Sequence, residues 1–260
     1  MQSGEYILDR LLVRIVRSVC DEQNISFRSY SDDWILELTK RTVQKRICGY
    51  KFPLNDSAAA MIAQDKVAAY QVLIAGGVDA VEHILIRTKA THAQWPRQEL
   101  TGGFILKPLM GTSGHSVHAF NEIKEAKLVV QNSSIEAWAL SPRINIVRET
   151  RYVMLDGNVL LAYDKQPARR EGLVMFNLSK GARPQVIRPD EAQLTIARNA
   201  MRVLGLRVAA VDIVETAAGE KMVLEVNDGF MMEHFARTSP EYENIAYDIY
   251  RKIIATMMDL

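Results

Sequence analysis

The spacing of apolar residues along the chain follows two different periods. Recurrence every three to four residues predicts amphipathic helices, and alternation with polar residues predicts strands with one buried face. Helices are expected over residues 4–20, 55–75, 121–130, 189–204 and 240–258, the third of them capped by Asn121. A further helix start is indicated at Trp34, because Asp32 and Asp33 precede it.

Strands are predicted between these helices. They are expected over residues 25–29, 82–87, 103–108, 135–140, 144–155, 159–165, 172–181 and 208–227. The dipeptide Asp156-Gly157 is a strong hairpin signal between two of them. No linker rich in Gly, Ser or Pro divides the sequence, so its parts are expected to be lobes of one unit.

The last of these stretches predicts a polar hairpin with its turn at Gly219. Side chains alternate between the two faces of a strand, so Glu225 and Asn227 are expected on one face, with Asp212 opposite Glu225 on the neighbouring strand. The other face is expected to enter a core and carries Leu224 and Val226. Two carboxylates and an amide oxygen suit Mg²⁺. A plain hairpin with a solvated face is the alternative.

Two lysines lie upstream of this hairpin. Lys66 belongs to a predicted helix, where a lysine is usually a solvated charge. Lys107 follows three apolar residues and precedes Pro108 and a Gly/Ser/Thr loop, and a buried ammonium in such a position needs an anion as partner. The glycines of that loop let backbone N–H groups approach phosphate oxygens, although a flexible surface turn fits them as well.

The long hairpin over residues 144–165 adds two more cations. Alternation places Glu149 and Arg151 on the same face of its first strand, and Lys165 ends its second strand. Without further context, Arg151 and Lys165 are typical edge-strand charges.

Composition narrows the classes of protein without naming one. The chain has 260 residues, 48% of them hydrophobic and 24% charged, with a formal net charge of +1. These values are typical of a soluble globular protein and give no attraction to nucleic acid or to an anionic membrane. No apolar run reaches the roughly 18 residues of a membrane span, and the N-terminus lacks a signal-peptide pattern. The two cysteines have no metal-ligand spacing, so a cytoplasmic location is expected.

In their order along the chain, these features resemble the ATP-grasp superfamily, and most closely its branch of glutathione-synthetase-like and ribosomal-protein glutamate ligases. The resemblance spans residues 55–235. Its parts are Asp65-Lys66, Leu106-Lys107-Pro108 with the glycine loop, the strand from Trp138 to Leu140, Glu149 to Arg151, Lys165, Asn177 with Gly181, and Asp212 with Glu225 and Asn227.

The resemblance implies an α+β (α/β) chain with the ATP-grasp fold, in which two lobes of mainly antiparallel sheets and flanking helices grip ATP between them. It divides the chain into a shortened N-terminal lobe over residues 1–55 and an ATP-grasp unit over residues 56–260. The latter comprises a small lobe over residues 80–135 and a C-terminal lobe over residues 136–260.

The resemblance also implies a role for each matching residue. The α- and β-phosphates of ATP would be held by Lys66 and Lys107, under a loop formed by Gly111, Thr112, Ser113 and Gly114. Contacts to adenine and ribose would come from Glu136, Trp138, Ala139, Leu140 and, as a weak candidate, Glu149. The γ-phosphate and the acyl phosphate formed from it would be served by Arg151, Lys165 and Asn177, and magnesium would be held by Asp212, Glu225 and Asn227.

The implied activity is an ATP-dependent carboxylate–amine ligase that forms an amide or peptide bond through an acyl phosphate and releases ADP and phosphate. Its cofactors would be ATP and Mg²⁺, with two ions expected and Mn²⁺ as a substitute. Its partners would be small amino-acid or peptide substrates, or a peptide or protein substrate, with no nucleic acid and no membrane, and a homodimer is compatible with the resemblance. This chemistry needs no histidine nucleophile, so His115 and His118 are expected to be solvated loop residues or substrate contacts.

Two alternatives stay open at this stage, a phosphotransferase of the same architecture and a non-catalytic nucleotide-binding module that regulates a partner. The chain also departs from the family pattern. Only about 55 residues precede the helix with Lys66, which leaves the identity of the carboxylate substrate undetermined. No acidic residue directly follows Leu140 to bind the ribose.

Overall fold

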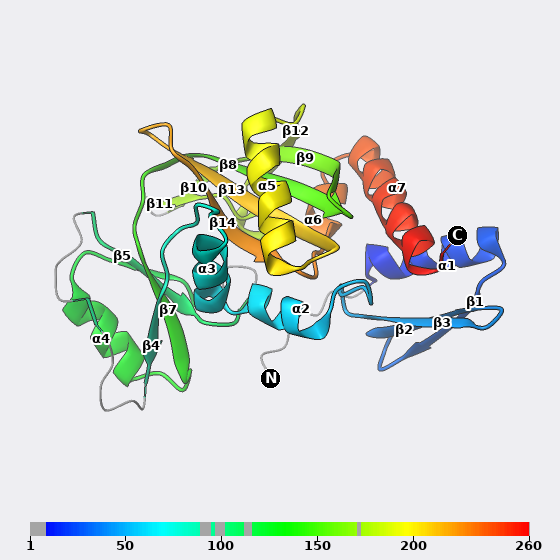
Figure 1. The fold of residues 1–260 in the computed structure, drawn as a ribbon, viewed down its shortest axis with the longest axis horizontal. Coiled ribbons are helices and arrows are strands. Elements are labelled where there is room, and N and C mark those ends of the chain that lie inside the picture. The colour runs from blue at the N-terminus through cyan, green and yellow to red at the C-terminus, as the bar shows by residue number, and fades with distance from the viewer. Residues whose placement is uncertain (1–8, 89–94, 97–101, 112–115, 171–172, 260) are drawn as a thin grey trace.

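The computed structural model describes residues 9–88, 95–96, 102–111, 116–170 and 173–259. Figure 1 shows three parts along the long axis, namely a small sheet with one helix, a larger sheet flanked by helices, and a three-stranded meander formed by residues 26–48. Strand pairs within these sheets are antiparallel, as expected. In the described part of the chain, no helix is long and apolar enough to cross a membrane.

The helix predicted over residues 4–20 corresponds to α1 (Leu11–Gln23), and residues 4–8 of that prediction lie outside the described residues. Asp9 has a positive φ of 56° and Arg10 is extended, so neither residue continues the helix toward the N-terminus. The apolar side of α1 is buried in one core with the last helix, α7 (Pro240–Met257). The N-terminal segment therefore shares its core with the C-terminal end of the chain.

The prediction of a helix at Trp34 is wrong. Three successive residues before it have positive φ and form a turn, and they are Ser31, Asp32 and Asp33. The surrounding residues form the meander β1 (Ser26–Tyr30), β2 (Ile35–Lys40) and β3 (Val43–Cys48). Leu36 and Leu38 alternate in sequence and are fully buried against the core, and this burial favours a strand over a helix.

The helix predicted over residues 55–75 is divided in two, α2 (Ser57–Gln64) and α3 (Lys66–Ala75). Asp65 between them is extended, and its side chain accepts hydrogen bonds from two backbone N–H groups of the next turn. A helix cap of this kind satisfies N–H groups that have no partner within the helix. The break places Lys66 at the first position of α3.

The small sheet has the strand order β4-β7-β5-β6. Its elements are β4 (Ile84–Arg87), β5 (Phe104–Pro108), β6 (His118–Phe120) and β7 (Ala137–Pro142), covered by α4 (Ile123–Gln131). Its core is built on large side chains, among them Phe104, Leu106 and Trp138. The N-cap of α4 is Glu122 and not Asn121, since the Glu125 carboxylate accepts from the Glu122 backbone N–H. Strand β7 belongs to this sheet, which therefore extends past residue 135.

The larger sheet separates two apolar cores. Its order is β12 (Arg183–Val186), β9 (Asn158–Gln166), β8 (Ile146–Leu155), β13 (Val208–Thr216) and β14 (Lys221–Asn227). One face packs against α2, α3 and α5 (Glu191–Leu204), and the other packs against α1, α6 (Glu233–Ala236) and α7. The helix α5 is capped by Asp190 and ends at Gly205, close to the prediction.

The strand expected over residues 172–181 is much shorter. Within the described residues, which do not include Gly172, it is represented by β11 (Leu173–Met175), which pairs with β10 (Ala168–Arg170) and is followed by the 3₁₀ turn η1 (Leu178–Lys180). Gly181 adopts a φ of 101° at the end of that turn.

Candidate nucleotide and metal site

The hairpin β13–β14 has the predicted register. Asp212 pairs with Glu225 across the two strands, and Gly219 takes a φ of 82° in the turn. The register shifts directly after this pair, because Ile213 pairs with Val223. This bulge leaves Leu224 out of the ladder, so the core is entered by Val223 and Val226 and not by Leu224, contrary to the prediction.

Asp212 lies in a buried cluster of four charges. Arg151, its register partner on β8, donates from Nε at 2.7 Å and from Nη2 at 2.6 Å to the two carboxylate oxygens. Lys165 on β9 lies 3.0 Å from Asp212 Oδ1 and 2.5 Å from Glu149 Oε1. Two cations thus face two carboxylates in the interior. Loss of any one of the four side chains would leave a buried charge without its partner and would destabilise the fold. Neither Arg151 nor Lys165 is an edge-strand charge.

The charges around Asp212 set its protonation state. Burial alone would raise the pKa of the Asp212 carboxyl, but Arg151 and Lys165 outweigh burial and hold the pKa at about 2. Asp212 is therefore ionised at neutral pH. As an anion it can hold cations, either the two basic side chains or a metal ion.

Lys66 and Lys107 lie near Glu225 of the same hairpin. Lys66 is 8% exposed, and its Nζ donates to the Gly111 carbonyl at 2.9 Å and lies 3.7 Å from Glu225 Oε1. Burial lowers the pKa of Lys107 to about 8, with Glu225 opposing and Lys66 adding to that shift. Both lysines therefore lie within electrostatic reach of Glu225, although they come from different elements.

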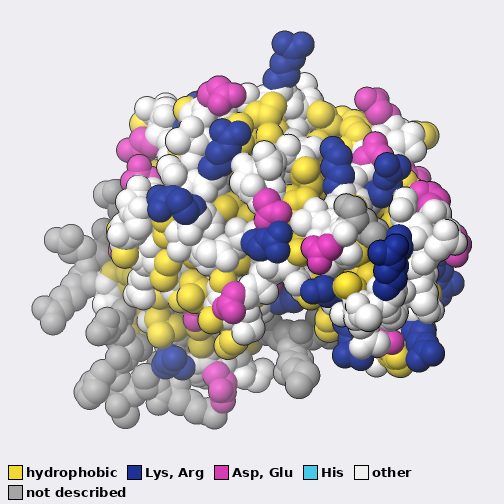
Figure 2. Space-filling view, turned by 45° about the vertical axis from the view of Figure 1, so that its right-hand side comes forward, with side chains coloured by type: hydrophobic (Ala, Val, Ile, Leu, Met, Phe, Trp, Pro, Cys, Tyr) yellow, Lys and Arg dark blue, Asp and Glu magenta, His cyan; other side chains and the backbone are white. Residues whose placement is uncertain are grey.

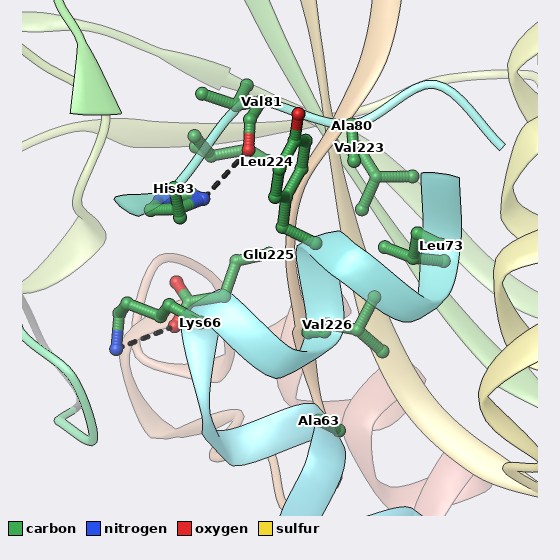
Figure 3. A pocket seen from close by; sticks show the side chains of 12 residues that line it. Ala63, Lys66, Leu73, Ala80, Val81, His83, Val223, Leu224, Glu225 and Val226 are labelled. Carbon is green, nitrogen blue, oxygen red and sulfur yellow. Dashed lines mark hydrogen bonds and ion pairs between the residues drawn. The ribbon is translucent and has the colours of Figure 1, made fainter. Parts of the chain in front are cut away.

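A pocket opens between α3, β14 and the segment before β4, with Lys66 and Glu225 on its wall (Figure 3). His83 also lines this pocket, and sequence analysis did not single it out. Its Nδ1 contacts the Val81 carbonyl at 2.8 Å, while its Nε2 is buried and has no hydrogen-bond partner among the described residues. Burial and the nearby lysines lower the pKa of His83 to about 3, so the ring is neutral. In the sequence, the only signal for His83 is a single histidine directly before an apolar strand.

The residues predicted to contact adenine lie on β7, in the middle of the small sheet. Trp138, Ala139 and Leu140 are almost fully buried, and each pairs with both β4 and β5. Glu136 directly precedes the strand. Beyond Leu140 the strand pairs with β5 alone, at Ser141 and Pro142, so backbone groups on the side of β4 are available for a ligand at this end.

The remaining predicted residues are placed as follows. Glu149 belongs to the buried cluster with Lys165 and does not lie at the end of β7. Asn177 precedes η1, and among the described residues no hydrogen bond or ion pair joins it to that cluster. Asn227 pairs with Ala210 in the hairpin, and its buried Nδ2 has no hydrogen-bond partner in the described structure. Gly111 is described, whereas Thr112, Ser113 and Gly114 lie outside the described residues, as does His115.

The donors present fit a magnesium ion at the end of the hairpin. Asp212 and Glu225 are paired across the strands and Asn227 follows two residues on, so two carboxylates and one amide are brought together. Mg²⁺ takes one or two carboxylates and leaves its other positions to water and phosphate oxygens. Within the described ranges, no group of three or more His, Cys, Asp and Glu side chains has metal-binding spacing, so a closed all-protein site is not formed there.

Two antiparallel sheets, with Lys107 of the small sheet and Lys66 of α3 close to a carboxylate hairpin of the larger sheet, are the features of an ATP-grasp fold. The chain belongs to the family described as the RimK-like ATP-grasp domain, whose model matches residues 63–255.

Comparisons with known proteins agree with this assignment. The chain is 28% identical over 220 residues to a probable alpha-L-glutamate ligase of Vibrio vulnificus, covering 77% of this chain and 67% of that protein. It is 30% identical over 194 residues to a probable alpha-L-glutamate ligase of Klebsiella pneumoniae, covering 68% and 59%. The aligned region thus spans about two thirds of these relatives or less.

Solved structures show the same fold. A D-alanine–D-alanine ligase from Bacillus anthracis superposes with a TM-score of 0.61 at 17% identity, over 79% of this chain and 69% of that one. The ATP-grasp ligase PsnB, in complex with a minimal precursor, superposes with a TM-score of 0.55 at 19% identity, over 79% and 63%.

Proposed function

We propose that the protein is an ATP-dependent carboxylate–amine ligase. The proposal rests above all on three separate parts of the chain that lie close together. Lys66 lies on α3 and Lys107 on β5, and both are near the Asp212–Glu225 pair of the hairpin β13–β14. Cations that face paired carboxylates suit a triphosphate and its metal ion. The family assignment supports ATP and Mg²⁺ as the cofactors.

In this proposal Lys66 and Lys107 hold the α- and β-phosphates, and Asp212, Glu225 and Asn227 hold magnesium. Bound magnesium would neutralise charge on the phosphate oxygens. A carboxylate oxygen of the substrate attacks the γ-phosphorus while the bond to the bridging oxygen of ADP breaks. The amine nitrogen of the second substrate then attacks the acyl carbon, phosphate leaves, and the nitrogen loses a proton.

Arg151 and Lys165 are proposed to face the γ-phosphate and the acyl phosphate. Both now bind Asp212, so they and the ligand must share this carboxylate or exchange partners when the nucleotide binds. Their fixed positions on neighbouring strands supply positive charge where the transferred group carries negative charge.

The finer assignments also belong to the proposal. Two metal ions are expected, with Mn²⁺ able to replace Mg²⁺, and adenine is expected beside the free end of β7. Asn177 and the loop that contains Thr112, Ser113 and Gly114 are proposed to lie near the transferred phosphate. The names of the glutamate ligases suggest L-glutamate as one substrate, and we propose that it supplies the amine while a peptide or protein supplies the carboxylate. A cytoplasmic location and a homodimer stay predictions.

The proposed function is tested by measuring ADP release from ATP with pairs of carboxylates and amines, including L-glutamate with short peptides. ADP and free phosphate should form only when both substrates are present, together with an amide product seen by mass spectrometry. Release of AMP and pyrophosphate, or a stable phosphorylated acceptor, would contradict the ligase. Lys66→Met should abolish turnover in any active pair, while Lys252→Met, an exposed lysine on α7, should not.

A further inference from the structure

The segment after β3 lies directly against the residue that follows the metal-candidate hairpin. Lys51 forms an isolated antiparallel bridge with Gly229. A Cβ atom at Gly229 would lie 2.7 Å from Lys51 Cγ and 3.1 Å from the Tyr50 carbonyl oxygen, so a glycine is needed for this approach. The N-terminal segment thereby delivers a side chain to the edge of the proposed active site.

The Lys51 ammonium is attached to this edge by one ion pair. Its Nζ lies 3.1 Å from Asp228 Oδ2, and Asp228 is 5% exposed whereas the Lys51 side chain is 47% exposed. The same Asp228 oxygen also accepts from Gln64 Nε2 at 3.2 Å. The Asp228 carboxylate therefore has a second hydrogen-bond donor, Gln64 of α2. The Lys51 ammonium has three N–H donors and can bind a further acceptor besides Asp228.

Through Asp228 and Gln64, Lys51 is linked to residues that are neighbours in sequence of the proposed metal and phosphate ligands. Asp228 follows Asn227 directly, and Gln64 lies two residues before Lys66. In the proposed function Lys66 and Lys107 are occupied by phosphates. A second anionic group beside Glu225 and Asp228 then needs a cation of its own, and Lys51 is the ammonium that the structure places at Asp228.

We infer that Lys51 binds the unreacted α-carboxylate of an amino-acid substrate and so makes the site select free amino acids over their α-amides. The inference rests on the proposed function, since an amino acid that supplies its amine to the ligation keeps its carboxylate. The Lys51 ammonium can form an ion pair with a carboxylate, whereas a neutral α-amide offers it only a carbonyl acceptor and lacks the Coulomb attraction between two full charges. Lys51 is thus a specificity-determining residue and takes no part in phosphoryl transfer.

The test measures binding of L-glutamate and of its α-amide by isothermal titration calorimetry, with Mg²⁺ and a non-hydrolysable ATP analogue present. We expect the wild-type protein to bind L-glutamate about tenfold more tightly than the amide. Lys51→Met should remove this preference by weakening glutamate binding about tenfold. Lys51→Arg should retain the preference, and the exposed control Lys252→Met should leave both affinities unchanged.

Wild-type protein that binds both compounds equally, or binds neither, overturns the inference, and so does a Lys51→Met variant that keeps the preference. Thermal unfolding of each variant establishes that it is folded. Failure of the inference is distinguishable from failure of the proposed function, because ADP release with a carboxylate and an amine is measured separately. ADP release that persists with unchanged selectivity in Lys51→Met leaves the ligase standing and removes the role of Lys51.

Discussion

The buried cluster of four charges gives a prediction for Lys165→Met. Lys165 is only 4% exposed and contacts both Glu149 and Asp212, so its loss leaves one guanidinium, that of Arg151, facing two buried carboxylates. Removal of one partner from a buried ion pair costs about 3–5 kcal/mol, because the remaining charge is desolvated without compensation. We expect the free energy of unfolding of Lys165→Met at pH 8 to fall by about this amount.

The deficit in the free energy of unfolding of Lys165→Met, relative to the wild-type protein, should depend on pH. Burial already raises the pKa of Glu149 against the attraction of Lys165, and without Lys165 this pKa rises further. A carboxyl whose folded-state pKa exceeds its unfolded value binds more protons in the folded state, so stability increases as pH falls through the folded-state pKa. The deficit relative to wild type should therefore be smaller at pH 5.5 than at pH 8. In the wild-type protein the low pKa of Asp212 keeps that carboxyl ionised across this window, and Arg151, which donates two hydrogen bonds to it, is still present in the variant.

Urea denaturation followed by circular dichroism at both pH values measures the effect. The matched control is Lys221→Met, whose ion pair with Asp190 is much more exposed and should cost less than about 1 kcal/mol. The double variant Lys165→Met/Glu149→Leu should recover part of the loss, because it removes the unpaired carboxylate as well. A deficit of the same size at both pH values, or one no larger than that of Lys221→Met, would refute the role assigned to the cluster.

Three further predictions concern the site. Glu225→Gln should lower turnover by at least about 100-fold in an ADP-release assay while the protein stays folded, since one carboxylate ligand is lost; near-normal turnover would exclude Glu225 as a metal ligand. Because the pKa of Lys107 is about 8, its cationic form is lost as pH rises through 8. The affinity for ATP, measured by fluorescence titration, should weaken above that pH, and Lys107→Met should remove this step. Gly229→Ala should lower the free energy of unfolding by about 1–3 kcal/mol, because the new methyl group meets the Lys51 side chain at 2.7 Å; an unchanged urea midpoint would contradict the close contact.

Much of the secondary structure follows from local sequence signals. The Asp156-Gly157 turn, the helix that ends at Gly205 and the hairpin turn at Gly219 all lie where the sequence predicts them, because each depends on backbone conformations that few residues adopt. The predicted secondary structure is wrong where a local signal favoured a different element from the one that tertiary packing stabilises. Two aspartates before Trp34 are typical of a helix start, yet burial of the alternating leucines that follow made the segment a strand.

The candidate site divides in the same manner. The sequence by itself determined that Asp212 faces Glu225, since a hairpin turn of known position sets the register of the two strands that it joins. Only the tertiary structure decided that Arg151 and Lys165 bind Asp212, that Lys66 reaches Glu225, and that Lys51 lies against Gly229. These contacts join elements far apart in the chain, and their partners are chosen by the packing of sheets and helices, which no local periodicity specifies.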